Sequence, residues 1–135
     1  MKNIRIYFIF AILGVTQISA DEIPIDSKED AYNDFWCAAI AGKREVRYNY
    51  TTSDNISSFI KIDCETDDLV IEGGLDKRSS LDSIQQSVFA GILSGKKAAI
   101  YIYDTDGKEG KYEYRIRTAA QALGIQYFSL GNNKE

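Results

Sequence analysis

The stretch from Lys61 to Gly74, KIDCETDDLVIEGG, decides how the rest of the chain is interpreted. It contains two short apolar segments on either side of a polar turn at Asp67-Asp68, and each segment ends near an acid, Asp63 in the first and Glu72 in the second. An acidic turn between two such segments is typical of a β-hairpin. Because hairpin strands run back alongside each other, we expect both carboxylates to approach one point at an edge of the sheet.

The N-terminus has the pattern of a secretory signal peptide. A basic start precedes the apolar run Ile6–Val15, and the small residue Ala20 closes the polar stretch that follows. The run is too short for a membrane anchor, which needs about 20 apolar residues. We therefore expect cleavage after Ala20, which leaves one domain over residues 21–135. The mature protein is expected to be exported, periplasmic or secreted, with no membrane attachment.

The charge balance and the absence of histidine limit the chemistry. Loss of Lys2 and Arg5 with the signal peptide changes the formal net charge from −4 to −6. A chain of this charge binds nucleic acid only through a local basic face, for which its basic residue pairs are the candidates. Without histidine, any metal must be held by oxygen atoms, which favours Mg²⁺, Mn²⁺ or Ca²⁺ over zinc.

Two cysteines, Cys37 and Cys64, lie in the expected mature chain. An even pair in an exported protein favours a disulfide, and the alternative is two small buried apolar residues that do not meet. Alternation along a strand directs Cys64 to the face opposite Asp63, where a packed helix would bring Cys37 within reach. A bridge would close a loop of about 27 residues, worth roughly 3 kcal/mol.

The periodicity of apolar residues predicts the order α-β-β-β-α-β-α-β. The first helix is expected to end where Gly42 adopts a left-handed conformation, and the first three strands should form an antiparallel meander. This order predicts an α/β (α+β) fold with a central mixed sheet flanked by helices. The expected strands are Glu45–Thr52, Ser58–Asp63, Leu69–Glu72, Ala98–Tyr103 and Ile125–Leu130, and the expected helices are Ser27–Ala41, Ser80–Ser94 and Tyr112–Leu123.

The same order, with an acid ending each of two consecutive strands, resembles the PD-(D/E)xK, or restriction-endonuclease-like, superfamily. The segments FWCAAIAGKREVRY, IKIDCETDDLVIEGG and IQQSVFAGILSGKKAAIYIY are similar to small exported bacterial proteins with that fold. The resemblance covers roughly Ala31 to Tyr103. It implies a restriction-endonuclease-like fold and a Mg- or Mn-dependent nuclease that acts on nucleic acid.

The resemblance also implies roles for individual residues. Asp63 and Glu72 take the places of the two metal-binding acids. Independently of the resemblance, the backbone carbonyl of Gly73, directly after the second acid, is expected to add a third oxygen ligand for Mg²⁺. Such a metal lowers the pKa of its bound water and stabilises charge on a phosphodiester. The alternative is that both acids are solvated residues at the ends of a hairpin, without a role.

One departure from the family pattern concerns the catalytic lysine. That lysine would lie two residues after Glu72, where this chain has Gly74. We expect Lys77 to supply the cation in preference to Lys61, although a solvated surface lysine is the alternative. Gln86 lies where a polar residue of the next helix often faces the site.

Two hypotheses about function therefore remain, a metal-dependent nuclease and a nuclease-fold binding module without catalytic activity. The acid pair favours the first, whereas Gly74 and the net acidity favour the second. A separate segment, Asp104–Glu113, has the Asp-x-Asp-Gly pattern of a calcium loop but lacks the full set of ligands, so that a polar loop is the alternative.

Overall fold

The computed structural model describes residues 29–131. The expected signal peptide, the expected helix start at Ser27 and the last four residues lie outside this range. The elements are the helices α1 (Glu29–Ala39), α2 (Ser83–Ser94) and α3 (Lys111–Ala122), the short 3₁₀ helix η2 (Arg78–Asp82), and the strands β1 (Lys43–Thr51), β2 (Ser57–Glu65), β3 (Leu69–Leu75), β4 (Lys97–Asp104) and β5 (Gln126–Gly131).

The five strands form one mixed sheet in the order β1-β2-β3-β4-β5. The pairs β1–β2 and β2–β3 are antiparallel, which confirms the predicted meander. The pairs β3–β4 and β4–β5 are parallel, and α2 and α3 are their crossover helices. The α+β class with a mixed central sheet is therefore confirmed.

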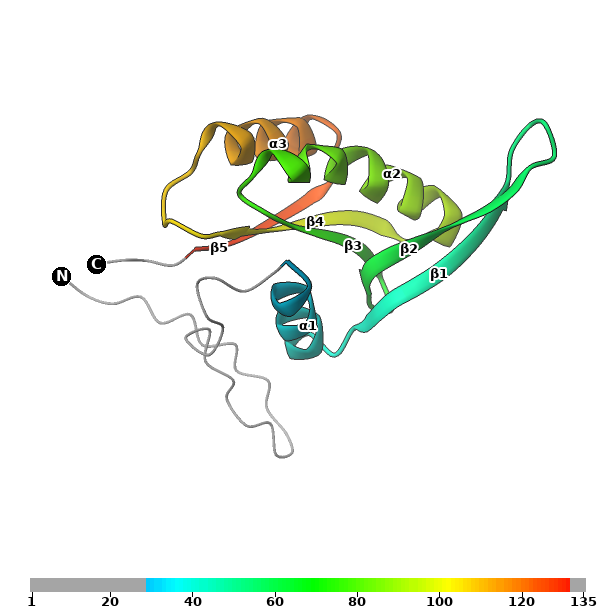
Figure 1. Ribbon diagram of the computed structural model, residues 1–135, viewed down its shortest axis with the longest axis horizontal. Helices are drawn as coiled ribbons and strands as arrows, with labels where there is room; N and C mark the ends of the chain where they lie inside the picture. The colour runs from blue at the N-terminus through cyan, green and yellow to red at the C-terminus, as the bar shows by residue number, and fades with distance from the viewer. Residues whose placement is uncertain (1–28, 132–135) are drawn as a thin grey trace.

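The sheet separates two layers of helix, with α2 and α3 on one face and α1 on the other (Figure 1). The inner strand β4 is buried from Ala99 to Tyr103, as its uninterrupted apolar sequence predicts. Its side chains alternate between the two layers, so that Ile100 and Ile102 pack with α3 while Tyr101 and Tyr103 pack with α1.

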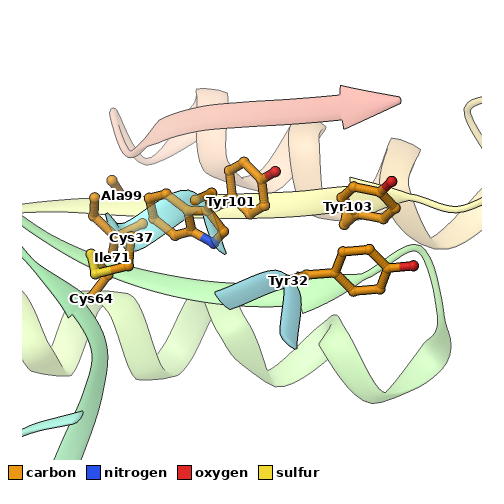
Figure 2. Packing of buried hydrophobic residues seen from close by; sticks show 8 residues of the cluster. Tyr32, Cys37, Cys64, Ile71, Ala99, Tyr101 and Tyr103 are labelled. Atoms are coloured by element: carbon orange, nitrogen blue, oxygen red, sulfur yellow. A yellow bond between two sulfur atoms is a disulfide. The ribbon is translucent and has the colours of Figure 1, made fainter. Parts of the chain in front are cut away.

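The α1 side of the core consists largely of aromatic rings (Figure 2). Tyr32 stacks on Tyr103 with ring centroids 3.8 Å apart, and Trp36 stacks on Tyr101 at 4.2 Å. Stacked rings of this kind add about 0.5–1.5 kcal/mol per pair to the burial of their apolar area. This packing fixes the position of α1 against β4.

A disulfide joins Cys37 of α1 to Cys64 of β2, with Cα atoms 5.7 Å apart, and confirms the predicted bridge. Both cysteines are fully buried beside the aromatic rings (Figure 2). Gly42 passes close to the bridge, because a Cβ atom there would lie 2.4 Å from the Cys64 sulfur. The left-handed residue that ends α1 is Ala41, with a φ of 55°, and the prediction that Gly42 has this conformation is wrong.

Other boundaries differ from the predictions in ways that affect the site. Strand β3 continues through Gly73 and Gly74 to Leu75, three residues beyond its expected end. The segment expected to open the second helix first forms η2, and α2 begins at Ser83. Within residues 29–131, no helix is long and apolar enough to cross a membrane.

Candidate functional site

Asp63 and Glu72 lie where strands β2 and β3 separate. The β2–β3 ladder contains only the pairs Cys64↔Ile71 and Glu65↔Val70, and the two acids are the next residues beyond it. In place of a strand carbonyl, the Asp63 carboxylate accepts the Gly73 N–H at 2.9 Å. The acids therefore meet in an opening within the sheet, between two inner strands, and not at its edge as we expected.

The two carboxyl groups are hydrogen-bonded to each other, which confirms that the hairpin brings them together. Glu72 is only 5% exposed, and burial, with the charge of Asp63 next, raises the pKa of Glu72 to about 9. Burial also raises the pKa of Asp63, against the Gly73 N–H and the Arg44 charge, which lower it. At neutral pH Glu72 is therefore protonated and donates its proton to the Asp63 carboxylate.

Glu29 adds a third carboxyl group to this site. It opens α1 and lines the same cavity as the acid pair. Burial raises the pKa of Glu29, and the neighbouring charge of Asp63 raises it further. No sequence pattern marks Glu29 as a functional residue, because an acid in the first turn of a helix is common for reasons of helix stability alone.

Arg44 is the cation in contact with the acid pair. Its Nη1 donates to the backbone carbonyl of Asp63 at 2.5 Å and lies 3.9 Å from the Asp63 carboxylate. Asp34 of α1 accepts from the Nε atom of the same side chain at 2.6 Å. Arg44 thereby joins α1 to β2 where the sheet opens.

The expected cation, Lys77, has no contact with the acid pair among residues 29–131. It lies at the N-terminal boundary of η2 and does not line the cavity. Lys61 does line the cavity, and its ammonium lies 3.5 Å from the Glu45 carboxylate. The contacts therefore identify Arg44 as the cation beside the acid pair and Lys61 as the lysine of the cavity wall. Lys77 has neither position, because the chain turns into η2 directly after it.

Ser80 of η2 occupies the space in which a side chain at position 74 would begin. A Cβ atom on Gly74 would lie 2.3 Å from the Ser80 hydroxyl oxygen, closer than real contacts allow. The Ser80 hydroxyl is buried and donates to the Leu75 carbonyl at 2.6 Å. Glycine at position 74 is therefore part of the packing of η2 against β3.

The acid pair opens into a cavity of about 580 Å³ between β2, β3 and α2. Its walls include Gly73 and Gln86, two residues that we assigned to the site from the sequence. Four of the predicted site residues thus share one cavity, namely Asp63, Glu72, Gly73 and Gln86. Their chemical roles stay predictions.

A second group of acids lies at the carboxyl ends of β3 and β4. Oxygen atoms of Asp76, Asp104 and Asp106 fall within 4.8 Å of one another, so that the group can hold a metal ion. The sequence indicated this region through its Asp-x-Asp-Gly pattern but not Asp76, which the parallel pairing of β3 with β4 brings alongside. Glu113 of the same segment instead caps α3, since it accepts the Gly110 N–H at 2.9 Å.

Existing contacts already use the oxygen atoms of this second group. Asp104 accepts the N–H groups of Asp106 and Gly107, and Asp76 accepts the N–H and hydroxyl of Thr105. Such contacts are typical of an ordered turn after a strand. Both groups include a buried acid, Asp104 in one and Glu72 in the other, but in the acid pair burial and the charge of Asp63 raise the pKa of Glu72 to about 9.

Comparison of the chain with protein-family models, with curated proteins and with solved structures finds no match.

Proposed function

We propose that this protein is an exported, restriction-endonuclease-like hydrolase that cleaves phosphodiester bonds with a divalent metal ion at Asp63 and Glu72. The observation that supports it best is the hydrogen-bonded acid pair at the base of a polar cavity. Burying two carboxyl groups together is unfavourable unless a proton or a cation relieves their repulsion. Metal ligation is a function that explains why a chain would maintain such a pair.

The available ligands fit a hard cation. Asp63, Glu72 and the Gly73 carbonyl offer oxygen atoms, and Glu29 can add a fourth ligand from α1. Mg²⁺ and Mn²⁺ prefer such ligands, and the proton on Glu72 marks the position where positive charge is favourable. When bound, such an ion stabilises negative charge on a phosphodiester and lowers the pKa of coordinated water.

The protein's own residues hold this arrangement in place. Arg44 binds the Asp63 backbone and fixes the point at which β2 leaves β3. The Gly73 N–H orients the Asp63 carboxylate. Gln86, one of the cavity-lining residues, has a side-chain amide that can orient a phosphate oxygen or an attacking water.

A binding module without catalysis is the second candidate. It is favoured by the packing of Ser80 at the lysine position and by the lack of any ammonium beside the acid pair within residues 29–131. In this case the metal-bound cavity would bind nucleic acid without cleaving it. The disulfide fits an exported protein, and we propose the periplasm or the exterior of the cell as its location.

The test combines Mn²⁺ binding with cleavage. Calorimetric titration of Mn²⁺ into the wild type is expected to show binding that Asp63→Asn removes and that Asp76→Asn, in the second acid group, leaves intact. Cleavage of plasmid DNA or RNA that depends on Mn²⁺ and on Asp63 would support the hydrolase. Binding without cleavage of either substrate would support the binding module, and loss of binding only in Asp76→Asn would contradict both.

A further inference from the structure

The cavity that contains the acid pair also has an aromatic wall. Tyr50 of β1 and Phe89 of α2 line it, and their rings meet edge to face with centroids 5.0 Å apart and an interplanar angle of 89°. In this arrangement the ring that presents its edge keeps both of its faces free of the partner. Both residues are half-buried, so that their positions are fixed while part of each ring stays accessible.

Two glutamines lie beside this aromatic wall. Gln85 and Gln86 precede Phe89 by four and three residues, which places all three on one side of α2. Both glutamines line the cavity and are exposed, and neither side-chain amide hydrogen-bonds to another residue in the range 29–131. A free side-chain amide offers both donors and an acceptor, as the edge of a nucleobase does.

The charged groups in the cavity determine which part of a nucleotide can bind beside the acid pair and which part can bind at the aromatic wall. Among residues 29–131, its lining includes four carboxyl groups, two of them those of Glu29 and Asp82, but only one ammonium, that of Lys61. A phosphate is therefore repelled except where a divalent ion reverses the charge, at Asp63 and Glu72. The uncharged wall of rings and amides suits the base of the same or the next nucleotide.

We propose that the cavity binds single-stranded nucleic acid, with an unpaired base against Tyr50 and Phe89 and its edge toward Gln85. This inference rests on the proposed function, which places a phosphate at the metal. In a duplex the bases are stacked and paired inside the helix, so that neither their faces nor their pairing edges can reach the wall. Base stacking on aromatic side chains tolerates any sequence, and we expect little sequence preference.

The experiment measures binding by fluorescence anisotropy in Ca²⁺, with gels to show that the oligonucleotides stay intact. The probes are single-stranded DNA, single-stranded RNA and duplex DNA of one sequence, each about 12 nucleotides long. Single strands are expected to bind at least about tenfold more tightly than duplex, and EDTA is expected to abolish binding. The two single-stranded probes reveal whether DNA or RNA is preferred.

Variants test the wall directly. Phe89→Leu is expected to weaken single-strand binding about fivefold to 100-fold, as loss of a stacking partner predicts. The control is Phe59→Leu on β2, which removes an exposed ring outside this cavity and is expected to change binding less than twofold. Gln85→Ala alters an exposed side chain that the fold does not need, and it is expected to weaken binding severalfold.

The outcomes separate this inference from the proposed function. Equal affinity for duplex and single strands, or equal effects of Phe89→Leu and Phe59→Leu, would overturn the inference even if the protein cleaves DNA. Selective single-strand binding that depends on Phe89 and Gln85, without any cleavage, would support the inference and contradict the hydrolase.

Discussion

At the scale of single residues, the acid pair and the Gly74–Ser80 contact determine what this site can do. Glu72 is a buried acid that stays protonated at neutral pH, and the Asp63 carboxylate accepts a hydrogen bond from it. Gly74 leaves room for Ser80, so that no side chain at position 74 reaches the site from β3. The site therefore depends on carboxyl and amide groups, together with one guanidinium.

The proton on Glu72 predicts how stability depends on pH. The pKa of Glu72 is about 9 in the folded protein against a usual value of 4.5, so between these values the folded protein binds a proton that the unfolded chain has released. In EDTA, the free energy of unfolding is therefore expected to fall as pH rises from about 5 to about 9, by at most about 1.4 kcal/mol per pH unit from this group. Urea unfolding at several pH values measures this dependence.

Glu72→Gln removes the titrating group and is expected to flatten this pH dependence. Asp54→Asn, at the exposed turn between β1 and β2, is the control and is expected to leave the dependence unchanged. A slope that is equally steep in Glu72→Gln and in the wild type would show that another group carries the proton.

The contact between Gly74 and Ser80 predicts a coupled pair of substitutions. Gly74→Ala places a methyl group 2.3 Å from the Ser80 hydroxyl oxygen and is expected to destabilise the protein by about 1–3 kcal/mol. In Ser80→Gly the obstructing side chain is absent, so Gly74→Ala added to Ser80→Gly is expected to cost much less than it does alone. A double-mutant cycle in urea checks this, and strictly additive effects would contradict the contact.

At the scale of elements, Arg44 connects α1 with the point where β2 and β3 separate. The ladder between β1 and β2 is interrupted at Glu45, whose φ is 51°, between the pairs Arg44↔Cys64 and Val46↔Ile62. Across from it, the Asp63 carbonyl accepts a hydrogen bond from the Arg44 guanidinium. Arg44 thus holds the backbone of β2 where the ladders on both sides of Asp63 are interrupted.

Arg44→Ala is expected to lower the free energy of unfolding by about 1.5–3 kcal/mol, because a charged hydrogen bond to a partly buried carbonyl is lost. The matched control is Arg47→Ala on the same strand. The Arg47 guanidinium is exposed and lies 3.9 Å from the centre of the Phe59 ring, a contact worth about 1 kcal/mol or less. Equal losses of stability in the two variants, measured by urea unfolding, would contradict the special role of Arg44.

At the scale of the whole molecule, one face of the sheet provides a packed core and the other provides most of the cavity wall. The α1 face contains the disulfide and the stacked aromatic rings, which are buried and uniform in character (Figure 2). The face with α2 and η2 contributes the polar walls of the cavity. Strands β2 and β3 take part in both, since the acids extend from the same strands that the disulfide and the α1 packing hold, and α1 adds Glu29 to the cavity.

Removal of the disulfide tests how far the molecule depends on this face. Cys37→Ala combined with Cys64→Ala is expected to lower the free energy of unfolding by about 2–4 kcal/mol, because the unfolded chain gains the freedom of an open loop. Wild type in excess dithiothreitol is expected to unfold at the same urea concentration as the double variant. A difference of less than about 1 kcal/mol between oxidised and reduced wild type would show that the aromatic packing alone fixes α1.

The order of elements, the disulfide and the contact between Asp63 and Glu72 can all be predicted from the sequence alone. These features depend on local periodicity, on turn chemistry at Asp67-Asp68 and on the pairing of neighbouring strands, all of which act over short distances in the chain. The expected end of the second helix at Ser94 is also confirmed, because Gly95 follows it in a left-handed conformation with a φ of 71°.

Only the tertiary structure decided which residues surround the acid pair. Glu29, Arg44 and Ser80 reach it from three different elements, and Asp76 joins Asp104 only through the parallel register of β3 and β4. None of these contacts follows from spacing in the sequence. They depend on the angle at which α1 and η2 pack against the sheet and on the point at which β2 leaves β3, and both are set by the packing of the whole core.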